Sequence, residues 1–296
     1  MSDQRYSRVL RVPREFSATK DKGQRARPVR ALVLAGTRAE GDPLVAASGK
    51  PAKALVPVAG RPMLAWVVES LLNARIQPPV TVAVPGDIDQ NVFRDALPEN
   101  LRAQVSLVPA AGGPSASVLS SLEGRAAEAP ALLVTTADNP LLRSETVNAF
   151  LEAAEPAEGF DAFIALVPAA LVRAAFPARP STFYRFRDCA VSGANLFLFR
   201  TTRARAVAAF WRRLEAHRKS PLKMARQLGI ATLLAYRFGW LTLDAALERL
   251  GERTGCALGA VLLNDAEAAV DVDTIDDLSL VEPLLLARAA KLSIPA

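Results

Sequence analysis

Short apolar runs alternate with amphipathic stretches along most of the chain. In the first half, four apolar runs have the length of buried strands and lead into glycine, proline or aspartate: residues 30–35, 80–84, 104–108 and 131–136. Apolar positions recur at helical spacing in residues 62–74, and residues 117–127 form a second candidate helix. This alternation predicts an α/β fold with a doubly wound, mainly parallel central sheet, whose ligand site lies at the carboxyl ends of the strands. The loops after Leu34, Val108 and Thr136 should therefore converge.

The second half of the chain continues the pattern less regularly. Further strands are predicted at residues 161–167, 182–187, 195–199 and 257–263, with a hairpin-like turn over residues 188–193. Helices are predicted over residues 202–218 and 221–252, the second of them broken near Gly239. We expect a domain over residues 29–285, in which residues 161–265 form an inserted, substrate-facing α+β lobe, and a C-terminal tail at 286–296.

The net charge of +6 favours anionic ligands, although part of the excess is concentrated in residues 1–28. We expect this basic segment to be a flexible tail with at most weak contact to an anionic surface, and no specific nucleic-acid partner. It has no apolar core of a secretory signal, and no uncharged apolar run in the chain approaches the ~18 residues of a membrane span. Cys189 and Cys256 show no metal-ligand spacing, which indicates structural thiols in a cytoplasmic protein.

The single histidine, His217, lies in a charged run. Hydrolysis by a serine–histidine or cysteine–histidine pair and histidine-rich metal sites are therefore disfavoured. Catalysis in this chain must depend on carboxylates, lysine, arginine and backbone amides.

A glycine turn follows the first predicted core strand, in the sequence Leu34-Ala35-Gly36-Thr37-Arg38. Such a turn lets backbone N–H groups approach phosphate oxygens, although it matches neither a Walker A motif nor GxGxxG. The connection from residue 36 to residue 60 is longer than usual, which is typical of a functional loop on an α/β scaffold. It contains the start of the segment KALVPVAGRPML at residues 53–64.

Together these two segments resemble the MobA-like nucleotidyltransferases, which have a GT-A/Rossmann-like fold and include guanylyl-, cytidylyl- and uridylyltransferases. The resemblance implies that Leu34, Ala35, Gly36 and Arg38 form the nucleotide loop and that Lys53 lies near the α-phosphate. Thr37 stands where the family has a second glycine, so this loop is either remodelled or less active.

Two later segments also resemble the family. In residues 112–122, Gly112 and Ser117 correspond to the loop that contacts the nucleobase, and a plain serine N-cap is the alternative. Asp138 directly follows an apolar strand, where the family has its metal-binding aspartate, and a helix cap is again the alternative.

Near the end of the chain, Asp271 and Asp273 point to the same side if the segment is extended. The resemblance makes Asp273 a metal ligand, and Thr274 with Asp277 matches a helix-capping pattern. We therefore expect Mg²⁺ (or Mn²⁺) on Asp138 and Asp273, with Asp271 as a further ligand, because carboxylates and substrate phosphates are the usual ligands of this ion.

The residues around 184–197 resemble the substrate strand of the family. Gly193 and Asn195 would line the acceptor pocket, and Arg185 or Arg187 could pair with an acceptor phosphate. Each arginine alone is more typical of a solvated surface cation.

The sequence thus predicts an enzyme of the EC 2.7.7 type that transfers a nucleoside monophosphate from an NTP to a phosphorylated small molecule and releases pyrophosphate. The serine-containing loop slightly favours CTP over GTP, and a homodimer is possible. The alternatives are a GT-A glycosyltransferase that uses a nucleotide sugar, and a catalytically weakened nucleotide-binding or scaffold protein.

Overall fold

The computed structural model describes residues 7–11, 28–36, 41–126, 129–217 and 227–292. Its strands are β1 (Ser7–Arg11), β2 (Val29–Leu34), β3 (Pro57–Val58), β4 (Arg61–Pro62), β5 (Val80–Val84), β6 (Val105–Pro109), β7 (Ala131–Thr136), β8 (Ala162–Pro168), β9 (Tyr184–Arg185), β10 (Ala190–Phe199) and β11 (Leu258–Leu262). Its α-helices are α1 (Pro43–Ser48), α2 (Met63–Leu72), α3 (Gln90–Ala96), α4 (Glu99–Arg102), α5 (Pro114–Leu122), α6 (Ser144–Ala154), α7 (Ala169–Ala175), α8 (Arg205–Ala216), α10 (Ile230–Arg237), α11 (Leu243–Thr254) and α12 (Ile275–Leu292). Short 3-10 turns are η1 (Lys53–Leu55), η2 (Thr202–Ala204) and η3 (Ala266–Ala269).

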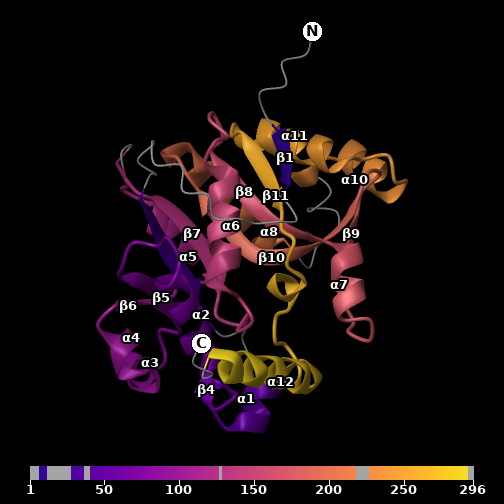
Figure 1. The fold of residues 1–296 in the computed structure, drawn as a ribbon. Helices are drawn as coiled ribbons and strands as arrows, with labels where there is room; N and C mark the ends of the chain where they lie inside the picture. The colour runs from indigo at the N-terminus through magenta and orange to yellow at the C-terminus, as the bar shows by residue number, and fades with distance from the viewer. Residues whose placement is uncertain (1–6, 12–27, 37–40, 127–128, 218–226, 293–296) are drawn as a thin grey trace.

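Within the described residues, one nine-stranded sheet has the order β1-β11-β8-β10-β7-β2-β5-β6, with β9 paired to β10. The strands of this sheet pair in parallel except β10, which runs antiparallel to β7, β8 and β9. β3 and β4 form a separate antiparallel pair. Helices lie on both faces of this sheet (Figure 1). The α/β class and the mainly parallel central sheet that the alternation predicts are confirmed.

Alternate residues of the central strands fill two cores, one on each face of the sheet. Ala31 and Val33 of β2 pack with α2, α6 and α12, whereas Leu32 packs with α5, α8 and α11. Successive side chains of a strand point to opposite faces, so a strand covered on both faces must be apolar throughout. This requirement explains the uninterrupted apolar runs in the sequence. None of the described helices has the length and apolarity needed to cross a lipid bilayer.

Three expectations about domain boundaries differ from the structure. Part of the segment expected to be a flexible tail forms β1, which covers the otherwise open edge of the apolar strand β11. Residues 161–265 do not form a lobe with its own sheet, because they supply β8, β10 and β11 to the central sheet. The C-terminal boundary at residue 285 falls inside α12, which runs from Ile275 to Leu292.

Several boundaries of helices and loops in the structure differ from those predicted from the sequence. α5 begins at Pro114, three residues earlier than predicted, because Gly113 is the N-cap and proline suits the first helical turn. The predicted turn at residues 188–193 is shorter in the structure, since β10 already begins at Ala190 and includes Gly193. The long connection after β2 is not irregular throughout, as it contains α1 and η1.

Candidate active site

The three loops expected to converge do so at the carboxyl end of the sheet. The Ala35 amide donates to the Ala83 carbonyl (2.9 Å), and the Ala137 amide donates to the Leu34 carbonyl (3.1 Å). A side chain added at Gly36 would lie 3.9 Å from the Ala110 methyl group, in the loop after β6. The loops after β2, β6 and β7 therefore lie against one another. Thr37 and Arg38 lie outside the described residues.

Lys53 joins the two aspartates predicted to share a cation. Its Nζ donates to Asp138 Oδ2 at 2.8 Å and also to Asp273 Oδ1. The Lys53 side chain is 13% exposed and that of Asp138 22%, whereas that of Asp273 is 40% exposed. Residues from three distant parts of the chain therefore form one partly buried charged cluster.

Backbone contacts hold the two aspartates together. Asp138 follows β7 after one residue, Ala137, and its carbonyl accepts the Val272 amide at 2.8 Å, which places the neighbouring Asp271 and Asp273 beside it. Asp138 does not cap a helix, because the following helix α6 has Arg143 as its N-cap. The capping alternative for Asp138 is therefore wrong, whereas the Thr274–Asp277 cap is present at the start of α12.

Arg179 is a site residue that no sequence pattern indicated. Its guanidinium donates to Asp277 Oδ1 (2.9 Å), to Asp271 Oδ1 (3.0 Å) and to the Asp271 carbonyl (2.8 Å), and its side chain is only 10% exposed. Asp271 therefore faces Arg179 and does not belong to the Lys53 pair. The two residues are 92 positions apart, so nothing in local spacing could have connected them.

The charges of this cluster perturb one another. Burial opposes the charge on Lys53, but the carboxylates of Asp138 and Asp273 outweigh it and hold the pKa of the ammonium above its ordinary value. For Asp271, burial and the nearby charges of Asp138 and Asp273 raise the pKa despite the contact with Arg179. The site therefore concentrates more negative charge than its two cations neutralise.

The site fits a divalent cation. Asp138 Oδ1 is buried and has no hydrogen-bond partner among the described residues, and unpaired buried carboxylate oxygen is costly. The carboxylate of Asp273 lies next to it through their shared contact with Lys53. The described residues contain no group of three or more acidic, cysteine or histidine side chains arranged around one point. Two carboxylates with substrate phosphates are nevertheless the usual ligand set of Mg²⁺.

The second glycine loop is closed by Ser117. Its hydroxyl accepts the Ala111 amide (3.0 Å) and donates to the Gly113 carbonyl (3.1 Å), across the loop that contains Gly112. Ser117 lies inside α5, whose N-cap is Gly113, so the alternative of a plain serine N-cap is wrong. Ser117 shapes the loop predicted to contact the nucleobase.

Glu215 of α8 is a second candidate that the sequence did not reveal. Its Oε2 accepts both the amide (3.2 Å) and the hydroxyl of Ser115 in the first turn of α5. Its Oε1 would lie 3.1 Å from a side-chain carbon at Gly113, whose φ of +156° also disfavours any other residue there. A carboxylate is thus held at the amino end of α5, where the helix dipole stabilises negative charge.

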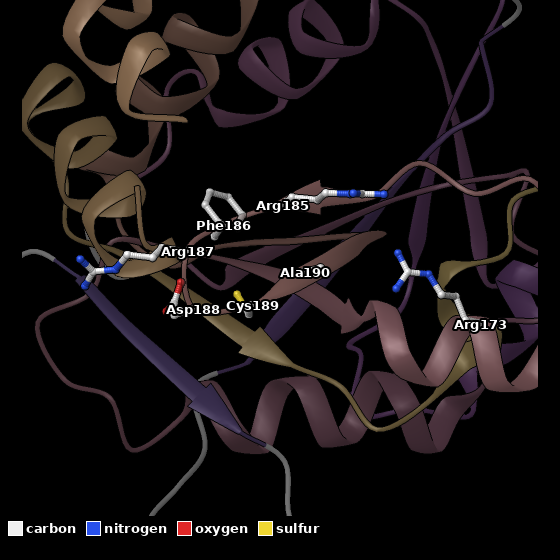
Figure 2. A pocket seen from close by; sticks show the side chains of 7 residues that line it. All are labelled: Arg173, Arg185, Phe186, Arg187, Asp188, Cys189 and Ala190. Atoms are coloured by element: carbon white, nitrogen blue, oxygen red, sulfur yellow. The ribbon is translucent and has the colours of Figure 1, made fainter. Parts of the chain in front are cut away.

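The predicted acceptor residues fall into two places. Arg185 and Arg187 border a hollow of about 780 Å³ between α7 and the β9–β10 hairpin. Figure 2 shows Arg173 and Arg185 at one side of this hollow and Arg187 at the other. Both predicted arginines are exposed, so the geometry suits a surface cation as well as an anion ligand.

Gly193 and Asn195 lie further along β10, closer to Asp138. Gly193 pairs with Leu166 and Phe197 with both Ile164 and Val134, and the register shifts between them. Asn195, in this bulge, has a positive φ of 49°, which is uncommon outside glycine. Asn195 is two residues before Phe197, which pairs with Val134, so Asn195 lies level with Thr136 at the end of β7. Such strained bulges are frequent next to functional sites.

Comparisons with known proteins agree with this geometry. A family model described as the MobA-like NTP transferase domain matches residues 31–228. Among solved structures, a hypothetical transferase from Thermus thermophilus is similar, with 31% identity, a TM-score of 0.70, and coverage of 85% of this chain and 99% of that one. No curated protein matches the chain.

Two more distant structures share the fold. A CMP:2-keto-3-deoxy-manno-octonic acid synthetase complexed with CTP has 14% identity and a TM-score of 0.55, with 88% of this chain and 99% of that one covered. A 4-diphosphocytidyl-2C-methyl-D-erythritol synthase has 17% identity and a TM-score of 0.51, with the same coverage of 88% and 99%.

Proposed function

Because the chain belongs to the MobA-like NTP transferase family, we propose that it transfers CMP from CTP to a phosphorylated small-molecule acceptor and releases pyrophosphate. Membership makes the chain an NTP-dependent nucleotidyltransferase. The choice of CTP, the acceptor class and the roles of individual residues are the proposal. The observation that supports it best is the Lys53–Asp138–Asp273 cluster beside the glycine turn of Ala35 and Gly36.

In the proposed reaction, a phosphate oxygen of the acceptor attacks the α-phosphorus of the NTP. The new P–O bond forms as the bond to the pyrophosphate oxygen breaks, and pyrophosphate leaves with the electron pair of that bond. Lys53, with Arg38, stabilises the negative charge that develops on the phosphoryl oxygens, and the amides after β2 position the phosphates. No protein nucleophile or general base is needed, which suits a chain with a single histidine.

Members of this family generally use a divalent metal, and we propose that this chain uses Mg²⁺ (or Mn²⁺). Asp138 and Asp273 would hold the ion, which supplies charge neutralisation to the NTP phosphates. Asp138 offers its unpaired Oδ1 for this purpose. Asp271, expected from the sequence as a further ligand, would instead add its negative charge to the site from its place beside Arg179, without coordinating the ion.

Base recognition is assigned to the loop around Gly112 and to Ser117. Glu215 adds a carboxylate at this loop, and a carboxylate accepts hydrogen bonds from an exocyclic amino group such as that of cytosine. Uracil has a carbonyl in that position and would be repelled. This feature supports CTP over UTP, and the short serine-containing loop is the basis for preferring CTP to GTP.

The acceptor is assigned to the side of β10. Gly193 and Asn195 would line its pocket near Asp138, and Arg185 or Arg187 would pair with its phosphate. A homodimer, a cytoplasmic location and the lack of a specific nucleic-acid partner stay predictions.

The proposal is tested by pyrophosphate release from each of the four NTPs with Mg²⁺ and a panel of phosphorylated metabolites. We expect release with CTP and one acceptor class, and its loss in Asp138→Asn and Asp273→Asn with folding retained. Asp276→Asn is the matched control, because Asp276 is exposed in the first turn of α12. Full activity in both site variants would refute the assignment of Asp138 and Asp273. Turnover of a nucleotide sugar without pyrophosphate release would instead identify a glycosyltransferase.

A further inference from the structure

α10 is a largely apolar helix that the described residues leave partly exposed. Its sequence is IATLLAYR, and none of its eight residues is buried. Two of them, Ile230 and Leu234, are 66% and 49% exposed. An amphipathic helix of a globular protein normally turns such residues toward a core. Ile230 and Leu234 therefore contribute little to the core that the described residues form.

The exposure continues beyond the helix. α10 ends in a tight turn in which Gly239 has a φ of +71° and the Trp240 amide donates to the Ala235 carbonyl at 2.8 Å. This turn presents Phe238 and Trp240, which are 59% and 68% exposed and whose rings stack with centroids 5.2 Å apart. Because the backbone fixes the turn, the two aromatic rings are held outward in water.

These residues form one surface with β9. The Tyr236 hydroxyl accepts the Arg185 amide at 3.2 Å, its ring contacts Phe186, and the neighbouring Tyr184 is 50% exposed. We call this the α10 apolar surface; it consists of Tyr184, Ile230, Leu234, Tyr236, Phe238 and Trp240. Outside it, the exposed large apolar residues of the described chain are the scattered Val92, Ile275 and Leu286. Clustered exposure of this kind marks an interaction site, whereas scattered single residues do not.

Most of the charges named beside the α10 apolar surface are positive, although the exposed Asp244 lies in the first turn of the following helix α11. Arg237 is exposed at the end of α10, and the adjoining hollow is bordered by Arg173, Arg185 and Arg187 (Figure 2). The one carboxylate bordering the hollow, that of Asp188, already accepts the Leu243 amide at 3.1 Å. The partner of this surface should therefore combine apolar material with negative charge.

We propose that the α10 apolar surface docks the enzyme on an anionic lipid bilayer. Tryptophan, tyrosine and phenylalanine side chains favour the interfacial region of a membrane, and arginines beside them pair with anionic headgroups. A second copy of the chain suits the surface less well, because a two-fold contact places each patch against itself and brings the flanking arginines together. The proposal concerns where the enzyme acts, so it holds whether or not the hollow also receives the acceptor phosphate.

Vesicle flotation of the full chain tests this proposal. Wild-type protein should float with vesicles containing phosphatidylglycerol and remain unbound with pure phosphatidylcholine. Phe238→Ser with Trp240→Ser should lower the bound fraction at least tenfold, and Arg237→Glu should weaken binding more at low than at high salt. All variants keep the basic residues 1–28, so any contact that this segment makes is the same in each.

Leu286→Ser is the matched control, since Leu286 is 54% exposed on α12, away from the α10 apolar surface (Figure 1). Equal flotation of the control and the Phe238/Trp240 double variant would overturn the proposal. So would a wild-type dimer in light scattering that the double variant dissociates, combined with no flotation, because the surface would then serve self-association. Pyrophosphate release in solution should be unchanged in the double variant, which separates this test from the one for the proposed function.

Discussion

Replacing Lys53 with methionine removes the cation that joins Asp138 to Asp273 while keeping the volume of the side chain. At the observed 2.8 Å and an effective dielectric constant of about 20, the gross attraction to Asp138 is about 6 kcal/mol. Desolvation of the largely buried ammonium cancels part of it, and breaking a buried pair typically costs about 3–5 kcal/mol. Because Asp273 is 40% exposed and can be rehydrated, we expect the lower end of that range.

The loss should be visible in both stability and rate. A destabilisation of about 3 kcal/mol lowers Tm by roughly 6–12 °C for a domain of this size. Loss of one charge-stabilising contact in the transition state should lower kcat by about 10² to 10³. Differential scanning fluorimetry and pyrophosphate release measure the two effects. Mg²⁺ should raise the Tm of Lys53→Met more than that of wild type, because the two carboxylates lose their resident cation.

Lys50→Met provides the control for this experiment, since Lys50 is exposed three residues earlier in the same segment. It should leave kcat within about twofold of wild type and shift Tm by no more than about 2 °C, because surface substitutions usually change stability by about 0.5 kcal/mol or less. If Lys53→Met retained wild-type kcat, the placement of Lys53 in the reaction would be refuted. If the rate fell but Mg²⁺ gave no added stabilisation, the two carboxylates would not form a common cation site.

Three further substitutions separate the parts of the site. Arg179→Lys keeps the positive charge, but a lysine cannot contact Asp277 and Asp271 at the same time. We therefore expect kcat to fall about tenfold and the Mg²⁺ concentration for half-maximal rate to rise. An unchanged dependence of the rate on Mg²⁺ would limit Arg179 to a structural role. Glu215→Gln should lower the preference for CTP over UTP about tenfold in kcat/KM, and equal discrimination in wild type and variant would exclude base reading. Burial would raise the pKa of Asp277, but hydrogen bonds from Thr274 and the charge of Arg179 outweigh it and hold that pKa below its ordinary value. Its stabilising effect is therefore present above the unfolded pKa of about 3.9 and is lost as pH falls through the folded value, so Asp277→Asn should flatten Tm against pH in the acid range.

The sequence predicted the parts of the fold that depend on local pattern. Residues 131–136 are apolar throughout and form β7, and residues 62–74 contain α2, because strand and helix periods are visible in single segments. The position of β1 was missed, since its five residues gain their structure only from the edge of β11. Residues 161–265 were predicted to form a separate lobe for the same reason, because the order of strands in a sheet depends on pairing between distant segments that no local pattern shows.

The site residues likewise divide into those that a local motif predicts and those that only long-range packing reveals. Asp138 and Asp273 were predicted because each lies in a motif that can be recognised by itself. Arg179 lies in an irregular segment before Pro180, and Glu215 lies on the helix α8 among other charged residues. Their partners are 98 and 100 positions away, so their roles depend on packing that no single segment displays.

The charge balance of the cluster gives a physical reason for its cation. Four carboxylates lie together, those of Asp138, Asp271, Asp273 and Asp277, and two cations, Lys53 and Arg179, contact them. Four negative charges and two positive charges leave a net charge of −2. Burial, and after it the charges of Asp138 and Asp273, raise the pKa of Asp271, which agrees with this excess of negative charge. One divalent ion cancels this charge, whereas a nucleoside triphosphate without a metal would increase the repulsion. The protein should therefore bind free NTP poorly and the metal complex well, and an affinity for CTP that did not change when Mg²⁺ was removed would contradict this balance.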